Sequence, residues 1–136
     1  MAATMKLEIV TPEGQAYAED VEMVTLTGEV GEMGVLPGHV RLLTGMVPGE
    51  LVVRRNGRDT FVATGIGIAE ITGDRVSILT DMAVAADKID EAKAEEARLR
   101  AEARLRDKIA DEEVASTNAA LARALAQLKV KRRHRV

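Results

Sequence analysis

The sequence predicts a β-sandwich, or flattened barrel, over residues 1–84, followed by an antiparallel two-helix hairpin over residues 85–136. Three observations carry this prediction. Apolar and polar residues alternate with period two in the first part, as in strands with one buried face. All 3 Pro and all 11 Gly occur at or before Gly73, where they mark turns between short strands. From Asp81 on, Ala and charged residues dominate, which favours helix.

The strands can be justified in chain order. Within residues 5–10 the apolar Met5, Leu7 and Ile9 alternate with Lys6 and Glu8. Residues 21–27 and 50–55 are rich in β-branched side chains. The pair Asn56-Gly57 predicts a type I′ turn, because both residues tolerate positive φ, and it joins residues 51–55 to residues 58–63. Gly73-Asp74 joins residues 68–72 to residues 75–80 as a second hairpin. Many short strands at this spacing favour a sandwich or barrel.

Two helices are expected next, over residues 88–109 and 112–131, with Asp111 as N-cap of the second. On the first helix we expect one apolar face of Ile89, Ala92, Leu99 and Ala103, with Ala94, Ala97, Ala101 and Leu105 beside it. On the second we expect a stripe of Val114, Leu121, Leu125 and Leu128. Burying an Ala methyl in this seam stabilises the hairpin far less than the roughly 1.5–3 kcal/mol that each buried Leu or Ile contributes. The hairpin should therefore dock weakly and be able to detach.

Composition excludes several classes of protein. Aromatic residues make up 1%, so the core must be aliphatic and the stacking platforms of single-stranded nucleic-acid binders are missing. Zero Cys excludes disulfides, a thiolate nucleophile and a cysteine zinc site. We expect no membrane span and no signal peptide, because no apolar run is long enough. Residues 1–84 hold six Lys or Arg against twelve Asp or Glu, whereas residues 85–136 hold thirteen against ten. Such segregation points to partners.

No catalytic site can be assembled from the sequence. Phosphate-loop and nucleophile-elbow motifs are missing, and Gly65-Ile66-Gly67 is interpreted as a bulge or close strand crossing. Two His are too few for a multi-His metal site, so we expect no metal and no resident cofactor.

Two features of the sequence each allow more than one interpretation. His39 follows a rigid Pro-Gly turn, and it is either bonded to local backbone or a contact for a partner protein, with a catalytic base as the remaining option. From Arg123 on, the chain has six Lys or Arg and no Asp or Glu. This run is either a solvated tail or a contact for an acidic protein surface, whereas nucleic acid is disfavoured by the acidic total charge.

A long motif, Gly28-x-x-Gly31-Glu32-Met33-Gly34-x-x-Pro37-Gly38-His39-x-x-Leu42-Leu43-Thr44, closely resembles the epsilon subunit family of bacterial and chloroplast-type rotary ATP synthases. Val10-Thr-Pro, Pro48-Gly49, Gly65-Ile-Gly67 and the run from Ile89 to Ala92 agree in order. The resemblance covers nearly the whole chain.

The resemblance implies a non-catalytic subunit of the central stalk. The sandwich would then bind the gamma subunit and meet the c-ring, with Glu32, Met33, Gly34, Pro37, Gly38 and His39 at this interface. The hairpin would inhibit ATP hydrolysis when it extends into the alpha/beta catalytic head, and the basic contacts would be Arg123, Lys129, Lys131, Arg132 and Arg133. The chain would lie peripherally on the cytoplasmic face of a bacterial inner membrane, in preference to a chloroplast thylakoid, and attach only through the complex.

Some members of this family bind regulatory ATP on the folded hairpin through a motif similar to Ile89-Asp90-x-x-Lys93-Ala94. Here Lys93 replaces the family's Arg, which loses the bidentate fork suited to phosphate. Arg100 and Arg123 could assist, and the other interpretation is that Asp90 only caps the first helix. The alternative to a stalk subunit is a free-standing β-sandwich binding module with a helical tail.

Overall fold

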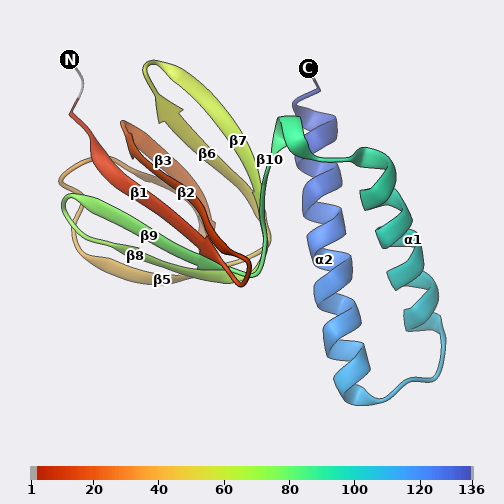
Figure 1. Cartoon of the computed structure of the whole chain (residues 1–136). Coiled ribbons are helices and arrows are strands. Elements are labelled where there is room, and N and C mark those ends of the chain that lie inside the picture. Colours follow the sequence, from red (N-terminus) through yellow and green to blue (C-terminus); the bar gives the residue numbers. More distant parts are fainter. Residues whose placement is uncertain (1–2, 136) are drawn as a thin grey trace.

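The computed structural model describes residues 3–135 and has a β-sandwich followed by a helical hairpin (Figure 1). The strands are β1 (Met5–Thr11), β2 (Gly14–Val21), β3 (Met23–Gly28), β4 (Gly31–Val35), β5 (Leu42–Met46), β6 (Gly49–Arg55), β7 (Arg58–Thr64), β8 (Gly67–Ile71), β9 (Arg75–Thr80) and β10 (Ala83–Ala85). The helices are a 3₁₀ turn η1 (Ala86–Lys88), α1 (Glu91–Arg106) and α2 (Asp111–Arg133). The predicted fold class is confirmed.

The strands form one curled sheet in the order β10-β7-β6-β3-β5-β8-β9-β1-β2, and β4 pairs with β3. The β1–β9 pair is parallel, and the other pairs described are antiparallel. The two halves of the sheet enclose a core whose largest fully buried members are Leu7, Ile9, Leu26, Met46, Leu51, Ile71 and Ile78. The buried core among the described residues is aliphatic, with Tyr17 packed at its margin, as the composition predicts.

The two predicted hairpins form. Asn56 and Gly57 have φ of 54° and 73°, the positive values that a type I′ turn requires. The β8–β9 turn closes through a 2.8 Å hydrogen bond from Thr72 N to Arg75 O. A Cβ at Gly67 would lie 2.2 Å from Leu79 O, so the glycine segment is a close strand crossing as interpreted.

The single strand predicted over residues 21–27 is wrong. Val21 ends β2 and Met23 begins β3, with a bend at Glu22 between them. Glu22 N donates to Arg54 O at 2.8 Å, so the bend is tied to β6 and the chain changes partner strand there. Strand pairing, which β propensity does not reveal, decides this break.

The helices start and end differently from the prediction. Asp90 Oδ1 accepts a 3.1 Å hydrogen bond from Lys93 N, so α1 begins at Glu91 and not at residue 88. Asp111 is the first residue of α2 and not its N-cap, because the extended Ala110 occupies the cap position. Asp111, Glu112 and Glu113 still favour this end by lying near the positive end of the helix dipole.

The predicted inner face of α1 is wrong except at Ile89, which is buried just before the helix begins. Ala94 and Ala101 are buried, with Ala97 and Leu105 half-buried on the same side, whereas Ala92, Leu99 and Ala103 are exposed. The buried stripe is apolar at every turn, but the predicted one is interrupted by Glu96.

On α2, Leu128 is buried but Leu125 is exposed, which corrects the predicted stripe. Ala124, Ala126 and Val130 are buried instead. The reason is that α2 lies between the sandwich and α1 and must bury two sides, which places Leu125 on the remaining solvent side (Figure 1).

The hairpin docks on the sandwich through the C-terminal half of α2. Ala126 and Val130 join Ala63, Met82, Ala86 and Ile89 in a second apolar cluster, against which Phe61 and Val84 pack. The loop between the helices extends beyond the sandwich (Figure 1). The docking contact is thus concentrated near one end of the hairpin.

Candidate functional site

The outer surface of β5, β8 and β9 exposes large apolar side chains. Leu43, Ile68 and Leu79 point away from the core, and Ile66 precedes β8 on the same side. The register places Ile68 opposite Leu79 and places Leu43 opposite Glu70, so these residues lie on one surface. We call Leu43, Ile66, Ile68 and Leu79 the apolar outer face. Ile66, Ile68 and Leu79 line one groove, and exposed apolar surface of this kind is typical of interaction sites.

A shallow groove of about 400 Å³ follows this face between the β1–β2 turn and β8–β9. Val10, Pro12, Ile66, Ile68 and Leu79 supply its apolar lining, and Asp81 lies at its edge. Such a groove fits apolar side chains from another protein.

The sequence prediction missed the apolar outer face, although a signal for it exists. A strand with one solvated face should carry a polar residue at every second position. Ile78-Leu79 and Leu42-Leu43 break this alternation, because each has two apolar residues in succession. One member of each pair points to the core side and the other is exposed.

The predicted contact residues Glu32, Met33 and Gly34 lie on β4, in the β3–β4 hairpin. Glu32 is exposed, whereas Met33 is half-buried and packs against the main core. A Cβ at Gly34 would lie 2.9 Å from Met23 Cε, so the glycine makes room for Met23. Of the three, Glu32 is the side chain free to meet a partner.

The Pro37-Gly38-His39 segment is tied to the rest of the sandwich. Gly38 N donates to Gly73 O at 2.7 Å, which fixes this turn beside the β8–β9 turn. His39 Nδ1 lies 2.7 Å from Val40 O, and His39 N donates to Leu36 O at 3.1 Å. These are the local backbone bonds of the first interpretation of His39, and a contact with a partner stays a prediction.

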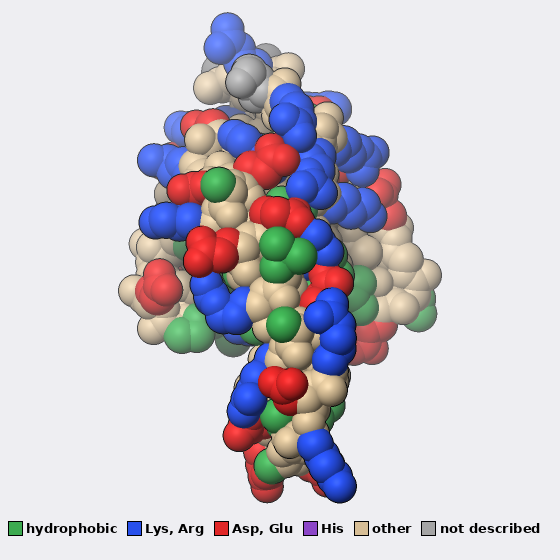
Figure 2. All heavy atoms as spheres, turned by 90° about the vertical axis from the view of Figure 1, so that its right-hand side faces the viewer, with side chains coloured by type: hydrophobic (Ala, Val, Ile, Leu, Met, Phe, Trp, Pro, Cys, Tyr) green, Lys and Arg blue, Asp and Glu red, His purple; other side chains and the backbone are tan. Residues whose placement is uncertain are grey.

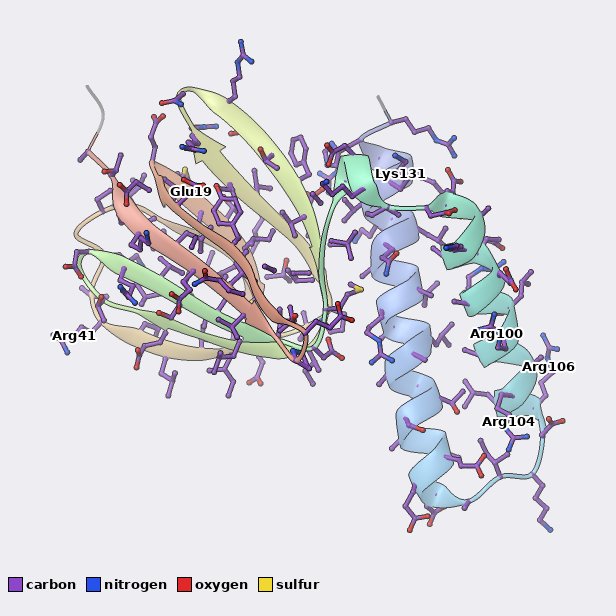
Figure 3. The ribbon with its side chains drawn as sticks, viewed as in Figure 1. Glu19, Arg41, Arg100, Arg104, Arg106 and Lys131 are labelled. Atoms are coloured by element: carbon purple, nitrogen blue, oxygen red, sulfur yellow. The ribbon has the colours of Figure 1, made fainter. Side chains whose placement is uncertain are left out.

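Several of the basic residues predicted on α2 contact the sandwich or the segment that follows it. Arg123 Nη1 pairs with Asp81 Oδ2 at 3.0 Å, and Lys131 Nζ donates to Ala86 O at 3.2 Å. Figure 3 shows Lys131 near the C-terminal end of α2, beside the segment that leads from β10 into η1. Arg133 Nη1 lies 3.5 Å from Glu50 Oε2, and Lys129 is exposed.

Arg132 instead joins the two helices. It pairs with Glu91 at 3.0 Å and with Glu95 at 2.9 Å, both on α1. Hydrogen bonds from Arg98 and then Arg132 hold the pKa of the Glu95 carboxyl below its ordinary value. These pairs flank the Ala-rich seam and remain accessible to water, with Arg132 48% exposed and each carboxylate 30% exposed, so each contributes little on its own.

The residues predicted to bind ATP are separately engaged. Asp90 caps α1, and Arg100 pairs with Glu96 at 3.2 Å along that helix. Arg123 is paired with Asp81, Ile89 is buried in the second apolar cluster, and Lys93 is exposed. The hydrogen bonds and ion pairs described within residues 3–135 do not link Asp90, Arg100 and Arg123 to one another. ATP binding stays a prediction.

The helical side of the molecule exposes many charged side chains of both signs (Figure 2). Figure 2 shows Lys and Arg side chains gathered on the upper part of this face, at the height of the C-terminal end of α2. Acidic and basic side chains alternate farther down. Within residues 3–135 no three His, Asp or Glu side chains come together as a metal site would need. Neither α1 nor α2 combines the length and apolar composition that crossing a bilayer requires.

Comparison with known proteins supplies the family. Residues 4–86 match the model of the ATP synthase delta/epsilon chain β-sandwich domain, and residues 87–132 match that of its long α-helix domain. The ATP synthase epsilon chain of Laribacter hongkongensis (strain HLHK9) is 43% identical over 129 residues, which covers 93% of this chain and 92% of the relative.

Solved structures agree with this relationship. A chain in the Euglena gracilis mitochondrial ATP synthase, solved with OSCP, F1 and the c-ring, matches with a TM-score of 0.75 at 26% identity, covering 95% of this chain and 81% of its own. A chain of the Tetrahymena thermophila mitochondrial ATP synthase central stalk and c-ring shares the fold, with a TM-score of 0.65 at 11% identity over 96% and 98% of the two chains. The resemblance to the epsilon subunit is thereby confirmed, and this chain belongs to the delta/epsilon chain family of the ATP synthases.

Proposed function

We propose that this chain is a non-catalytic central-stalk subunit of a proton-translocating ATP synthase, which couples the c-ring to the catalytic head. The observation that carries the proposal is the apolar outer face, exposed on a sandwich whose own core is filled. Family membership identifies the kind of complex that would cover such a face. A docking subunit needs an exposed surface of this type and no reacting groups.

The apolar outer face is proposed to bind the gamma subunit. It lies on paired strands, it includes a shallow groove, and it is apolar enough to form the centre of a stable interface. The exposed Glu32 and the adjoining β3–β4 hairpin are proposed to meet the polar loops of the c-ring. Pro37, Gly38 and His39 would support this second contact by fixing the neighbouring turn.

The hairpin is proposed to be regulatory. Its contact with the sandwich is limited to one side of the C-terminal half of α2, and α1 packs on α2. When extended, it would present Arg123, Lys129, Lys131, Arg132 and Arg133 to acidic loops of the alpha/beta catalytic head and hinder ATP hydrolysis. Since exposed ion pairs each contribute only ~0–1 kcal/mol, several must act together.

Truncation after Arg106 tests the inhibitory part of the proposal. The shortened chain keeps the whole sandwich but lacks α2, so ATPase activity of the assembled enzyme should rise. Copurification of the truncated chain with the complex is the control, because loss of the subunit itself could also change activity. Unchanged or lower ATPase activity with the truncated chain still bound would contradict inhibition.

A pull-down from native membranes separates the stalk subunit from a free-standing binding module. The stalk subunit should copurify with a gamma-type partner in a large complex, whereas a free-standing module would be recovered as a monomer or homodimer. We propose peripheral attachment, through that complex, at the cytoplasmic face of a bacterial inner membrane. Washing membranes free of the catalytic head should release the chain with its partners.

A further inference from the structure

We propose that Glu50, Phe61, Arg133 and His134 form a latch that holds the hairpin against the sandwich. We call these four residues the hairpin latch. The proposal rests on the regulatory role proposed above, because a latch has a purpose only if the hairpin also adopts another position. It identifies which contacts within this chain oppose extension.

The geometry of the hairpin latch is specific. The rings of Phe61 on β7 and His134 after α2 are stacked, with centroids 3.5 Å apart and planes 5° from parallel. His134 Nε2 also contacts Glu50 Oε1 on β6, so the imidazole N–H donates to the carboxylate. Arg133 Nη1 approaches the other Glu50 oxygen at 3.5 Å. One carboxylate therefore holds two successive residues at the end of α2.

Burial gives these contacts more weight than ordinary surface pairs. The side chains of Glu50 and His134 are only 15% and 20% exposed, although that of Arg133 is 62% exposed. The ion pairs along α1 and between the helices are more open to solvent than the Glu50–His134 contact. Undocking would leave the Glu50 carboxylate without its two partners and would uncover the Phe61 ring. Water screens the electrostatic attraction between partly buried groups less than that between exposed ones, so the docked contact is strengthened.

The position of the hairpin latch suits its role. The sandwich contacts of α2 begin with Arg123–Asp81, continue through Gln127 and Met82 and through Lys131 and Ala86, and end with the latch. The loop between the helices and most of α1 are remote from the sandwich (Figure 1). Because the hairpin is attached near one end, breaking the contacts at that end is enough to detach it.

The docked and extended states also compete for the same cations, one of which belongs to the hairpin latch. Arg123, Lys131 and Arg133 are bound to Asp81, Ala86 and Glu50 when the hairpin is docked. These are among the residues proposed to contact the catalytic head after extension. Acidic groups of a partner must therefore displace Glu50 and Asp81, which favours one complete change of position over gradual opening.

Fluorescence energy transfer on the full chain tests the hairpin latch. The sequence has no Cys, so dyes can be attached specifically at Arg58→Cys and Asn118→Cys, both exposed positions on the sandwich and the hairpin. A urea series brings the equilibrium between docked and extended hairpin into measurable range. In the docked state the two dyes should give a single transfer efficiency.

Glu50→Gln, Phe61→Leu and His134→Ala should each raise the ratio of extended to docked chains by roughly three- to tenfold, the range expected for loss of one aromatic or partly buried ionic contact. The matched control is Arg135→Gln. Arg135 follows the latch directly, but it pairs with Glu91 on α1 at 3.0 Å and not with the sandwich. Its ratio should stay at the wild-type value.

An unchanged ratio in Glu50→Gln and His134→Ala overturns the latch, and so does an equal rise in Arg135→Gln, which would indicate a general charge effect. Phe61→Leu could disturb β7, so its result is used only if the thermal unfolding midpoint of the sandwich is unchanged. If the midpoint falls, Glu50→Gln and His134→Ala alone test the latch. Measuring ATPase inhibition with the same variants separates the two proposals. A raised ratio with unaltered inhibition supports the latch and contradicts the inhibitory role.

Discussion

Gly67 shows how one residue sets the distance between two strands. Its Cα faces the backbone of β9 so closely that a Cβ would lie 2.2 Å from Leu79 O and 3.0 Å from Thr80 Cα. Neither atom belongs to a flexible side chain, so a larger residue must push the β8 and β9 backbones apart. Because Ile68 and Leu79 pair beside this point, the shape of the apolar outer face depends on the close approach.

Gly67→Ala should therefore destabilise the sandwich by about 2–3 kcal/mol, the range of substitutions that force a backbone shift. Gly73→Ala is the matched control, because a Cβ there meets nothing within 4 Å. It should stay within about 1 kcal/mol of wild type. Urea unfolding of both variants checks this expectation. Equal free energies of unfolding would show that β9 can move away from residue 67 without loss of stability.

The α2 helix shows how an element acquires two buried sides. Ala124 and Leu128 are buried, as are Ala126 and Val130, and the latter two belong to the cluster shared with Met82 and Ile89. Small residues allow close approach on both sides, and the larger Leu128 and Val130 near the C-terminal end supply more of the hydrophobic stabilisation. Docking is therefore weak along the helix and strongest near one end.

Leu128→Ala should lower the stability of the hairpin by about 2–5 kcal/mol, since this side chain is 2% exposed. Leu125→Ala removes the same atoms from a side chain that is 47% exposed, and it should cost less than about 1 kcal/mol. Loss of helical circular dichroism on heating provides the measurement. Similar losses for both variants would mean that Leu125 packs against a neighbour in solution as fully as Leu128 does.

At the scale of the whole molecule, the surface proposed for binding differs from the one on which the hairpin docks. The apolar outer face is on β5, β8 and β9, whereas α2 contacts β6, β7 and η1. We expect that the hairpin can leave the sandwich while the apolar outer face stays as it is, because within residues 3–135 the two surfaces meet only at Asp81, which pairs with Arg123 at the edge of the groove. This separation would let a subunit change the position of its helices while it stays attached.

Ile68→Asp should weaken association with the stalk at least roughly tenfold, because it buries a charge at the centre of the proposed interface. Leu99→Asp is matched in chemistry and exposure, at 53% against 50% for Ile68, but lies on α1. Leu99→Asp should leave association unchanged. Titrating each variant against complex depleted of this subunit gives the two affinities, and equal retention would place the interface elsewhere.

Much of the fold was predictable because the signals are local. Asn56-Gly57 specifies its turn by backbone preference alone, and the change from Gly-rich to Ala-rich sequence divides sheet from helix. The strands β2, β4, β5 and β10 were not individually predicted. Most of β2 is exposed, β4 and β5 contain Gly, and β10 has three residues, so pairing with neighbours defines them more than composition does.

Part of the candidate site could likewise be predicted from the sequence, and part could not. Glu32, His39 and the basic residues of α2 were named from motif and charge, which are properties of the sequence. The apolar outer face and the stacking of His134 on Phe61 join residues that are far apart in the chain, and no local pattern connects them. Residues 61 and 134 meet only because α2 returns along β7.

The sequence by itself determined two architectures, the order of the hairpin turns, an aliphatic core and the separation of charge between the parts. Each of these follows from neighbouring residues, through backbone preference and hydrophobic period. Tertiary structure decided which side of each helix is buried, where residues 21–27 break into two strands, and which cations are bound by the sandwich. These depend on surfaces that meet across long sequence separations, where several Ala-rich faces are equally apolar and only packing selects one.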